Sequence, residues 1–313
     1  MIGYTLRRAG TGLLLAVLVT FITYLLLSTS FDSIVRSIVG PTATPELVAA
    51  RKTQMGLDRP VLVQYAVWLG QVMRGDLGVS FFTSEPVGAA VTSRLTVTLS
   101  IVLVALVITA ITGVTLGVLA AGRSGVVDRL AQGISLTGLL VPNLLVAIVL
   151  VFVLAIQLKV LPATGFTHFS ENPGRWAATI TIPVIVLVVH GIANLTAQVR
   201  GAMIDELRKD YVRTLRTRGV PTRSVVLRHA LRNAAGPALT VLSLEFISML
   251  GGALIIENIF ALPGFGSYAF HAALQGDVPI IMGIALFGVL LVVGVNLITD
   301  LANGWLDPKA RLH

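Results

Sequence analysis

The sequence contains no cysteine and little charge, and each shortage excludes a class of protein. Without cysteine there can be no disulfide, no thiolate metal site and no cysteine nucleophile. Only 12% of the residues are charged and 55% are hydrophobic, whereas a soluble domain carries about twice that charged share. The 313-residue chain is therefore predicted to be an integral membrane protein.

Enzyme motifs are lacking as well. The sequence has no G-x-x-x-x-G-K-[ST] phosphate loop, no H-E-x-x-H zinc motif and no G-x-S-x-G nucleophile motif. Its five histidines show no metal-ligand spacing. We therefore expect no catalytic residue, no metal site and no cofactor in this chain. Any ATP hydrolysis coupled to its work would take place in another chain.

Long apolar segments are what the sequence has in abundance. Each is long enough for a helix across roughly 30 Å of hydrocarbon, and helices pair the backbone groups that lipid cannot. We therefore predict an all-α membrane protein with six transmembrane helices. The first segment is interpreted as a retained helix, because its apolar run is too long for a signal peptide and LSTSFDS is a poor cleavage site. The six segments are residues 9–29, 95–122, 130–158, 176–199, 233–256 and 278–299.

The net charge of +8 is explained by topology rather than by nucleic acid. With the N-terminus inside, fifteen of the 23 lysines and arginines lie in inner segments. Six of the other eight lie in the long loop over residues 36–94, and long loops translocate regardless of charge. Both termini are therefore predicted to be cytoplasmic.

The outer loop before the second span is predicted to contain helices. Thr44-Pro45-Glu46 combines a capping hydroxyl, a first-turn proline and a first-turn acid, and Gly56 is a plausible end. A second helix would start after Pro60 and either lie on the membrane surface or pack against the transmembrane helices. The stretch GDLGVSF at residues 75–81 indicates turns.

A basic segment lies between the fourth and fifth predicted spans. Residues 200–232 contain nine basic and three acidic side chains. Apolar residues at helical spacing predict an amphipathic helix over 201–218, which Gly219 would end. Pro221 would then start a second short helix that runs to about Asn233. Two interpretations remain open here, namely attraction to anionic lipid headgroups and docking of a protein partner.

Sequence motifs in this segment resemble those of a known family. DYVRTLRTRG at residues 210–219 and LRHALRNA at residues 227–234 resemble the cytoplasmic loop of ABC importer permeases for dipeptides, oligopeptides and nickel. Leu215 stands where that family usually has alanine, and Thr115 where it has proline. Ordered matches cover most of the chain, including MGLDRPVLVQYAVWL, LLVPNLLVAIVLV, GGALIIENIFALPGFG and VNLITDLANGWLDPKARL.

This resemblance implies a type I ABC importer (MetI-like) permease fold and a set of partners. The expected assembly pairs this chain with a second homologous permease, two ATPase subunits that hold ATP and Mg, and an extracytoplasmic binding protein that delivers peptide. It would lie in a bacterial plasma membrane. The corner between spans four and five would be the coupling helix seated on an ATPase. The coupling residues implied by the match are Asp210, Tyr211, Arg213, Thr214, Arg216, Gly219, Val220, Pro221, Thr222, Arg228, His229 and Asn233.

Together these observations predict a domain organisation and a cargo. Residues 1–30 would form the first transmembrane helix, 31–94 the outer loop with amphipathic helices, 95–306 the core permease domain with the coupling segment 200–233, and 307–313 a cytoplasmic tail. Dipeptides or longer peptides are the expected cargo, with nickel, glutathione or haem as alternatives. A stand-alone secondary transporter and a membrane scaffold without transport are the rival functions.

Polar residues inside the apolar segments are candidates for the translocation pathway. His190 and Asn194 share one helix face, and Glu245 lies mid-span with Ser248 near its face. Glu257 lies at the outer end of the same segment. The alternative role for such residues is hydrogen bonding between helices, which is typically worth about 0.6 kcal/mol per contact.

Overall fold

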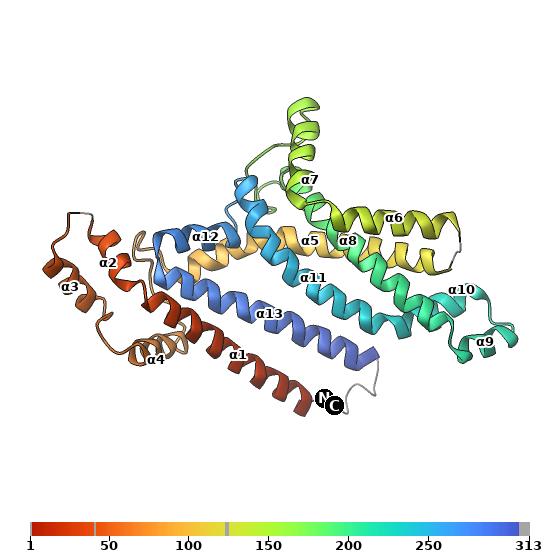
Figure 1. Ribbon diagram of the computed structural model, residues 1–313, viewed down its shortest axis with the longest axis horizontal. Helices are drawn as coiled ribbons and strands as arrows, with labels where there is room; N and C mark the ends of the chain where they lie inside the picture. Colours follow the sequence, from red (N-terminus) through yellow and green to blue (C-terminus); the bar gives the residue numbers. More distant parts are fainter. Residues whose placement is uncertain (1, 41, 123–124, 307–313) are drawn as a thin grey trace. The chain divides into compact units, whose positions relative to one another are not determined.

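The computed structural model describes residues 2–40, 42–122 and 125–306, and their regular elements are all helical (Figure 1). The prediction of an all-α protein is confirmed. The tail predicted at 307–313 lies outside the described residues. The chain forms two compact units, which we describe separately. The N-terminal unit comprises residues 2–97 and 263–294, and the core unit comprises residues 98–262 together with the chain from Val295.

Five helices of the described residues are long and apolar enough to cross a membrane. Each coincides with a segment predicted from the sequence. The second begins at Val87 rather than at the predicted Leu95, so its 36 residues extend about 54 Å, well beyond the hydrocarbon thickness. The five are α1 (Ile2–Ser28), α5 (Val87–Gly122), α8 (Pro173–Leu207), α11 (Leu231–Ile259), which continues the apolar run that starts at Thr222, and α13 (Val278–Leu306).

The third predicted span is not one helix. It consists of α6 (Val126–Leu140), α7 (Asn143–Leu150) and the π-helical η1 (Val151–Gln157). Val141 adopts an extended conformation (φ −80°, ψ 120°) because the ring of Pro142 disfavours helical geometry in the preceding residue. Pro142 also lacks the N–H that a continuous helix would need. The prediction of one helix over 130–158 is therefore wrong, and the count of six spans stays a prediction.

The N-terminal unit contains three short helices before α5. The predicted start at Thr44 is confirmed, because its hydroxyl accepts a hydrogen bond from the Leu47 amide at 3.4 Å and Pro45 opens the helix. The predicted stop is confirmed by the left-handed Gly56 (φ +69°). The helix over 31–39 was not predicted. The three are α2 (Phe31–Val39), α3 (Pro45–Gln54) and α4 (Val61–Val72), and α12 (Phe265–Gln275) belongs to the same unit.

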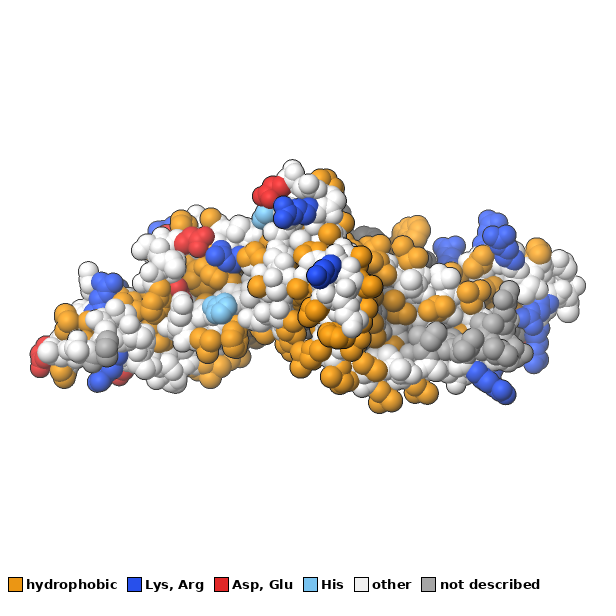
Figure 2. Space-filling model, turned by 90° about the horizontal axis from the view of Figure 1, so that it is seen from above, with side chains coloured by type: hydrophobic (Ala, Val, Ile, Leu, Met, Phe, Trp, Pro, Cys, Tyr) orange, Lys and Arg blue, Asp and Glu red, His pale blue; other side chains and the backbone are white. Residues whose placement is uncertain are grey.

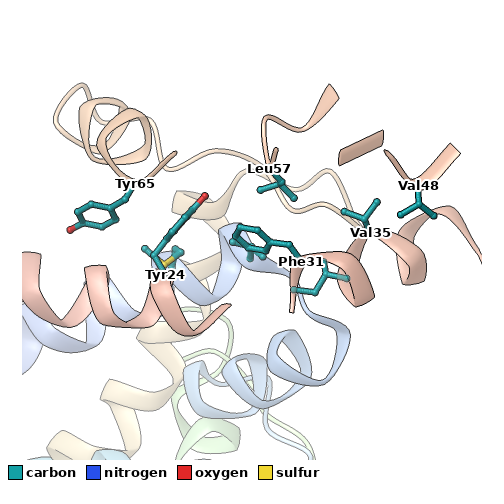
Figure 3. Packing of buried hydrophobic residues seen from close by; sticks show 9 residues of the cluster. Tyr24, Phe31, Val35, Val48, Leu57 and Tyr65 are labelled. Carbon is teal, nitrogen blue, oxygen red and sulfur yellow. The ribbon is translucent and has the colours of Figure 1, made fainter. Parts of the chain in front are cut away.

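An aromatic and aliphatic cluster holds these helices to α1 (Figure 3). The Tyr65 hydroxyl donates to the Val17 carbonyl at 2.9 Å and lies 2.9 Å from the Thr20 hydroxyl. Tyr24 donates to Gln64 Oε1 at 2.8 Å. The helix predicted after Pro60 therefore packs along α1.

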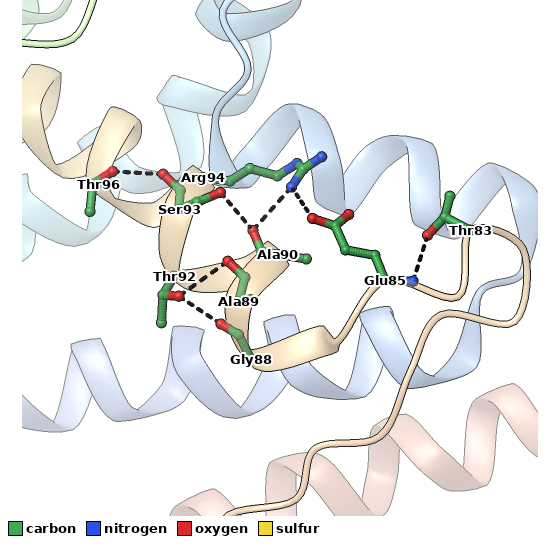
Figure 4. A network of polar contacts seen from close by, with 9 residues as sticks. All are labelled: Thr83, Glu85, Gly88, Ala89, Ala90, Thr92, Ser93, Arg94 and Thr96. Carbon is green, nitrogen blue, oxygen red and sulfur yellow. Dashed lines mark hydrogen bonds and ion pairs between the residues drawn. The ribbon is translucent and has the colours of Figure 1, made fainter. Parts of the chain in front are cut away.

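The start of α5 is fixed by polar contacts within the same unit (Figure 4). Arg94 donates to the Ala90 carbonyl at 3.2 Å and lies 3.6 Å from Glu85. Its guanidinium also stacks 3.9 Å from the ring centroid of Tyr268. Nearby, buried Asp277 accepts from the Ser80 hydroxyl at 2.5 Å and from the Phe81 amide at 3.2 Å, which ties the turn after α4 to the start of α13.

In the core unit, α8 packs against α5, α6 and α11 (Figure 1). Glycines permit the closest approaches. A Cβ at Gly113 would lie 2.9 Å from Leu195, and a Cβ at Gly117 would lie 2.8 Å from Val199. The G-x-x-x-G spacing on α5 therefore provides the close helix contact that the sequence indicated.

Candidate functional site: the basic elbow

The basic segment forms an elbow, which we define as residues 200–233. α8 ends at Leu207, Lys209 is extended (φ −68°, ψ 151°), and a new helix, α9 (Asp210–Thr217), begins at Asp210. The prediction of one helix over 201–218 is therefore wrong. An acid in the first turn favours a helix start at Asp210, so the chain turns between two helices rather than continuing one.

The predicted corner is present. Gly219 adopts the left-handed conformation (φ +77°), and the Val220 amide donates back to the Leu215 carbonyl at 3.1 Å. A side chain at position 219 would meet no atom within 4 Å, so the backbone conformation alone calls for glycine there. Pro221 precedes α10 (Thr222–Ser224), as the sequence predicted.

The helix after the corner does not end near Asn233. α10, the π-helical η2 (Val225–Ala230) and α11 form one helical run from Thr222 to Ile259. No glycine or proline interrupts residues 222–235, which explains why the helix continues past Asn233. The elbow is therefore joined to the fifth predicted span by a continuous helical run, in which Gly236 and Pro237 mark the first position where it can bend.

A buried carboxylate lies at the centre of the elbow. Glu206 is 6% exposed and accepts hydrogen bonds from the Tyr211 hydroxyl at 2.8 Å and from Asn233 Nδ2 at 2.9 Å. Lys209 Nζ lies 2.5 Å from its second oxygen. Burial of Tyr211 and its bond to Glu206 raise the pKa of that phenol above its ordinary value. Glu206 thus links α8, α9 and the start of α11.

The same two spans are joined a second time at mid-span. Asn194 Nδ2 on α8 donates to buried Glu245 Oε1 on α11 at 2.5 Å. Asn194 precedes Glu206 by twelve residues, and Glu245 follows Asn233 by twelve, a rise of about 18 Å along each helix. The elbow contact and the mid-span contact therefore lie on one pair of helices.

The elbow has one apolar side and one basic side. Val212 and Val225 are fully buried, and Met203, Ala230 and Ala234 belong to a cluster with residues of α5 and α8. Blue lysine and arginine side chains gather around α9 and α10 (Figure 2). The elbow therefore presents fixed positive charge on a packed base.

Comparisons with known proteins show the family of the chain. Residues 113–312 match the family described as binding-protein-dependent transport system inner membrane component, and residues 1–102 match its N-terminal domain. A probable peptide ABC transporter permease of Sinorhizobium fredii is 35% identical over 98% of this chain and 99% of its own length. The chain is a member of the peptide ABC transporter permease family.

Other relatives extend the comparison. A putative peptide transport system permease of Brucella abortus is 35% identical, and a metal-staphylopine import system permease of Staphylococcus aureus is 30% identical, each over 99% of both chains. A chain of the MetNI methionine ABC transporter in an inward-facing form matches with a TM-score of 0.57 at 14% identity, over 72% of this chain and 100% of that chain. This likeness concerns the fold and confirms the predicted importer permease architecture.

Most of the predicted coupling residues of this permease lie on its surface. Tyr211, Val220 and His229 are half-buried, and Arg213 lies 3.8 Å from Asp210. The sequence analysis missed Glu206 and Lys209 as members of the site. The exposed set comprises Asp210, Arg213, Thr214, Arg216, Gly219, Pro221, Thr222, Arg228 and Asn233.

The predicted pathway residues of the permease do not form one cluster. Asn194 and Glu245 meet, His190 is half-buried one turn before Asn194, and Ser248 is exposed on α11. Glu257 is fully buried and accepts a hydrogen bond from Thr98. The structure therefore separates Glu257 from the Asn194–Glu245 pair, and a role of either in translocation stays a prediction.

Proposed function

We propose that this permease is one half of the membrane part of an ATP-driven importer that takes up dipeptides or short peptides across a bacterial plasma membrane. It pairs with a second, homologous permease. Two ATPase subunits, which hold ATP and Mg, attach on the cytoplasmic side, and an extracytoplasmic binding protein delivers the peptide. Both termini are cytoplasmic in this proposal.

The elbow is the observation that carries the proposal. Attraction to lipid needs only charge, whereas a protein partner needs a surface of fixed shape. In the elbow, the left-handed Gly219 sets the corner and Glu206 holds α8, α9 and α11 together. Exposed arginines stand on that fixed frame. This combination favours docking on an ATPase.

Coupling to the cargo pathway follows from helix continuity. α8 and α11 both enter the elbow, and both carry a member of the Asn194–Glu245 pair. Movement of the elbow on ATP binding would displace both helices, because each is one helical run between the two contacts, although α11 carries Pro237 there, where it can bend. In this proposal the displacement opens the pathway alternately to the two sides, and His190, Asn194, Glu245 and Ser248 line it. Glu257 belongs to its outer end.

The test deletes the corner of the elbow and measures whether the ATPase still attaches to the permease. Deleting Gly219–Thr222 is expected to abolish co-purification of the ATPase while membrane insertion is retained. Deleting four exposed residues of the loop before α8, residues 168–171, serves as the length-matched control and should leave co-purification intact. An ATPase that still co-purifies with the corner deletion would refute docking at the elbow.

Topology is tested in separate variants that keep the full chain. Since the chain has no cysteine, single cysteines report without background. We expect Ser170→Cys to react with an impermeant thiol reagent added from outside, and Thr222→Cys to be protected. Reversed labelling would place the elbow on the wrong side for an ATPase.

A metal chelate is a second candidate cargo, favoured by the metal-staphylopine import system permease among the relatives. Uptake of a labelled dipeptide by the complete assembly, measured with and without a competing metal chelate, distinguishes the two. Loss of peptide uptake in a deletion strain would also exclude the scaffold. If the chain alone in vesicles drove uptake with an ion gradient and no ATP, a stand-alone transporter would replace this proposal.

A further inference from the structure

A small pocket lies at the inner side of the core unit, between the elbow and two spans. It has a volume of about 240 Å³ and is bordered by the last turn of α5. Ile204, Leu207 and Val226 give it apolar walls, and Arg208, Arg216 and Thr222 add two guanidinium groups and a hydroxyl. The pocket is distinct from the Asn194–Glu245 region, which lies further along α8.

The guanidinium groups of these two arginines have no partner among the described residues. Neither side chain forms a hydrogen bond or ion pair there. Among the acids of the elbow, Glu206 is already engaged by Lys209, Tyr211 and Asn233, and Asp210 lies beside Arg213. Asp205, the remaining acid of the elbow, is exposed and does not line the pocket. Among the described residues, therefore, two arginines line one pocket without a paired acid.

The position of the pocket identifies the kind of anion. Its walls come from the ends of α5 and α8 that the predicted topology places on the cytoplasmic side, where anionic headgroups of the inner leaflet are the membrane's own anions. Basic pockets between transmembrane helices on that side recognise anionic headgroups. A guanidinium group can donate two parallel hydrogen bonds to the oxygens of one phosphate group. The apolar walls suit the glycerol and the first carbons of an acyl chain. A protein carboxylate would gain less from those apolar walls.

We propose that this pocket binds the phosphate group of an anionic phospholipid of the inner leaflet. Arg208 and Arg216 donate to the phosphate oxygens, and the Thr222 hydroxyl is a further donor. The site depends on the inner placement of the elbow but not on ATPase docking, so failure of one leaves the other standing. Arg216 and Thr222 are also among the predicted ATPase contacts, and the experiment must separate the two roles.

The experiment uses the purified full chain and two double variants with equal charge loss. R208Q/R216Q removes the pocket pair, whereas R218Q/R223Q removes two exposed elbow arginines that do not line the pocket. Binding of phosphatidylglycerol, phosphatidylcholine and inorganic phosphate is measured by native mass spectrometry and by thermal stabilisation. We expect phosphatidylglycerol to bind the pocket variant about tenfold more weakly than the wild-type chain, and the control within about threefold, because only the pocket variant loses direct phosphate contacts.

Several results would overturn the proposal. Equal weakening in both variants would indicate general charge attraction. Displacement of phosphatidylglycerol by millimolar inorganic phosphate would assign the site to the soluble ion. Loss of ATPase co-purification in the pocket variant with unchanged lipid retention would assign the arginines to protein docking. If R208Q/R216Q does not fold, R208K/R216K keeps the charge but loses the paired donors, and wild-type lipid affinity in that variant would contradict the proposal.

Discussion

The elbow and the N-terminal unit both bury polar groups, but they distribute them differently. In the N-terminal unit the buried polar contacts are separate: Tyr24 pairs with Gln64, Tyr65 with Val17, and Asp277 with Ser80. Each lies beside a shared apolar cluster or a helix end. In the elbow, Tyr211, Asn233 and Lys209 all converge on one carboxylate, that of Glu206.

This difference has a consequence for mutation. A unit held by separate contacts retains most of its structure when one contact is lost. A joint held by one carboxylate loses the connection between α8, α9 and α11 in a single substitution. We therefore expect the effect of a mutation on stability and uptake to depend on how many polar contacts meet at the mutated side chain, as well as on its burial.

The largest effect is predicted for Glu206→Leu. The change removes the carboxylate acceptor of three polar groups, of which Asn233 keeps only its 3.3 Å bond to the Tyr211 hydroxyl. A hydrogen bond to a charged group is worth about 1.5–3 kcal/mol, less for the bond to exposed Lys209. The elbow would lose its fixed shape while the spans remain inserted. We expect ATP-dependent uptake to fall by more than about tenfold, since a loss of 1.4 kcal/mol already corresponds to a factor of ten. Uptake and ATPase co-purification are measured in vesicles.

Two controls sharpen this prediction. Glu206→Gln keeps an oxygen for Tyr211 but removes the ion pair with Lys209, so its effect should be intermediate. Asp205→Leu changes an exposed neighbouring acid and should leave uptake near wild type. Equal losses of uptake for Glu206→Leu and Asp205→Leu would show that the negative charge matters in the elbow, and not the set of contacts that meet at Glu206.

An intermediate effect is predicted for Asp277→Ala in the N-terminal unit. Asp277 is buried, and its loss leaves the Ser80 hydroxyl and the Phe81 amide without their acceptor, at a cost of about 1–3 kcal/mol. We expect a lower melting temperature of the purified chain but only a small loss of ATPase co-purification. Ser80→Ala leaves Asp277 with the Phe81 amide but removes the acceptor of the Phe82 and Thr83 amides, so its cost should be similar. Loss of ATPase binding in Asp277→Ala would break the distinction between the two regions.

Much of the fold could be predicted because it depends on local rules. Apolar length identified the five long helices, and Thr44-Pro45 identified the start of α3. The prediction of one helix for the third span was wrong because it relied on the length of the apolar run. Pro142 holds Val141 in an extended conformation, which breaks the helix there. α2 was missed because its nine residues carry no strong cap signal; Ser30 makes no side-chain capping bond.

The site was only partly predictable for a physical reason. Gly219 and Pro221 predict a corner from their backbone preferences alone, and the sequence analysis identified both residues. Glu206 was counted as one more charge on an amphipathic helix. Its partners Tyr211 and Asn233 are 5 and 27 residues away, and they meet it only because the chain breaks at Lys209. The sequence shows only an acid in a basic segment, and the burial that distinguishes Glu206 from Asp205 appears in the structure alone.

The smallest effect is predicted for Tyr65→Phe. The ring and its packing against Phe21 and Trp68 remain, and only the hydroxyl contacts to Val17 and Thr20 are lost. Thr20 keeps its own bond to the Ala16 carbonyl at 2.7 Å, so no hydroxyl is left unpaired. The cost should be about 1 kcal/mol or less, visible as a small drop in melting temperature with unchanged uptake. Tyr65→Ala, which removes the ring, should cost several times more; equal costs would mean that the hydroxyl rather than the apolar cluster holds α4 on α1.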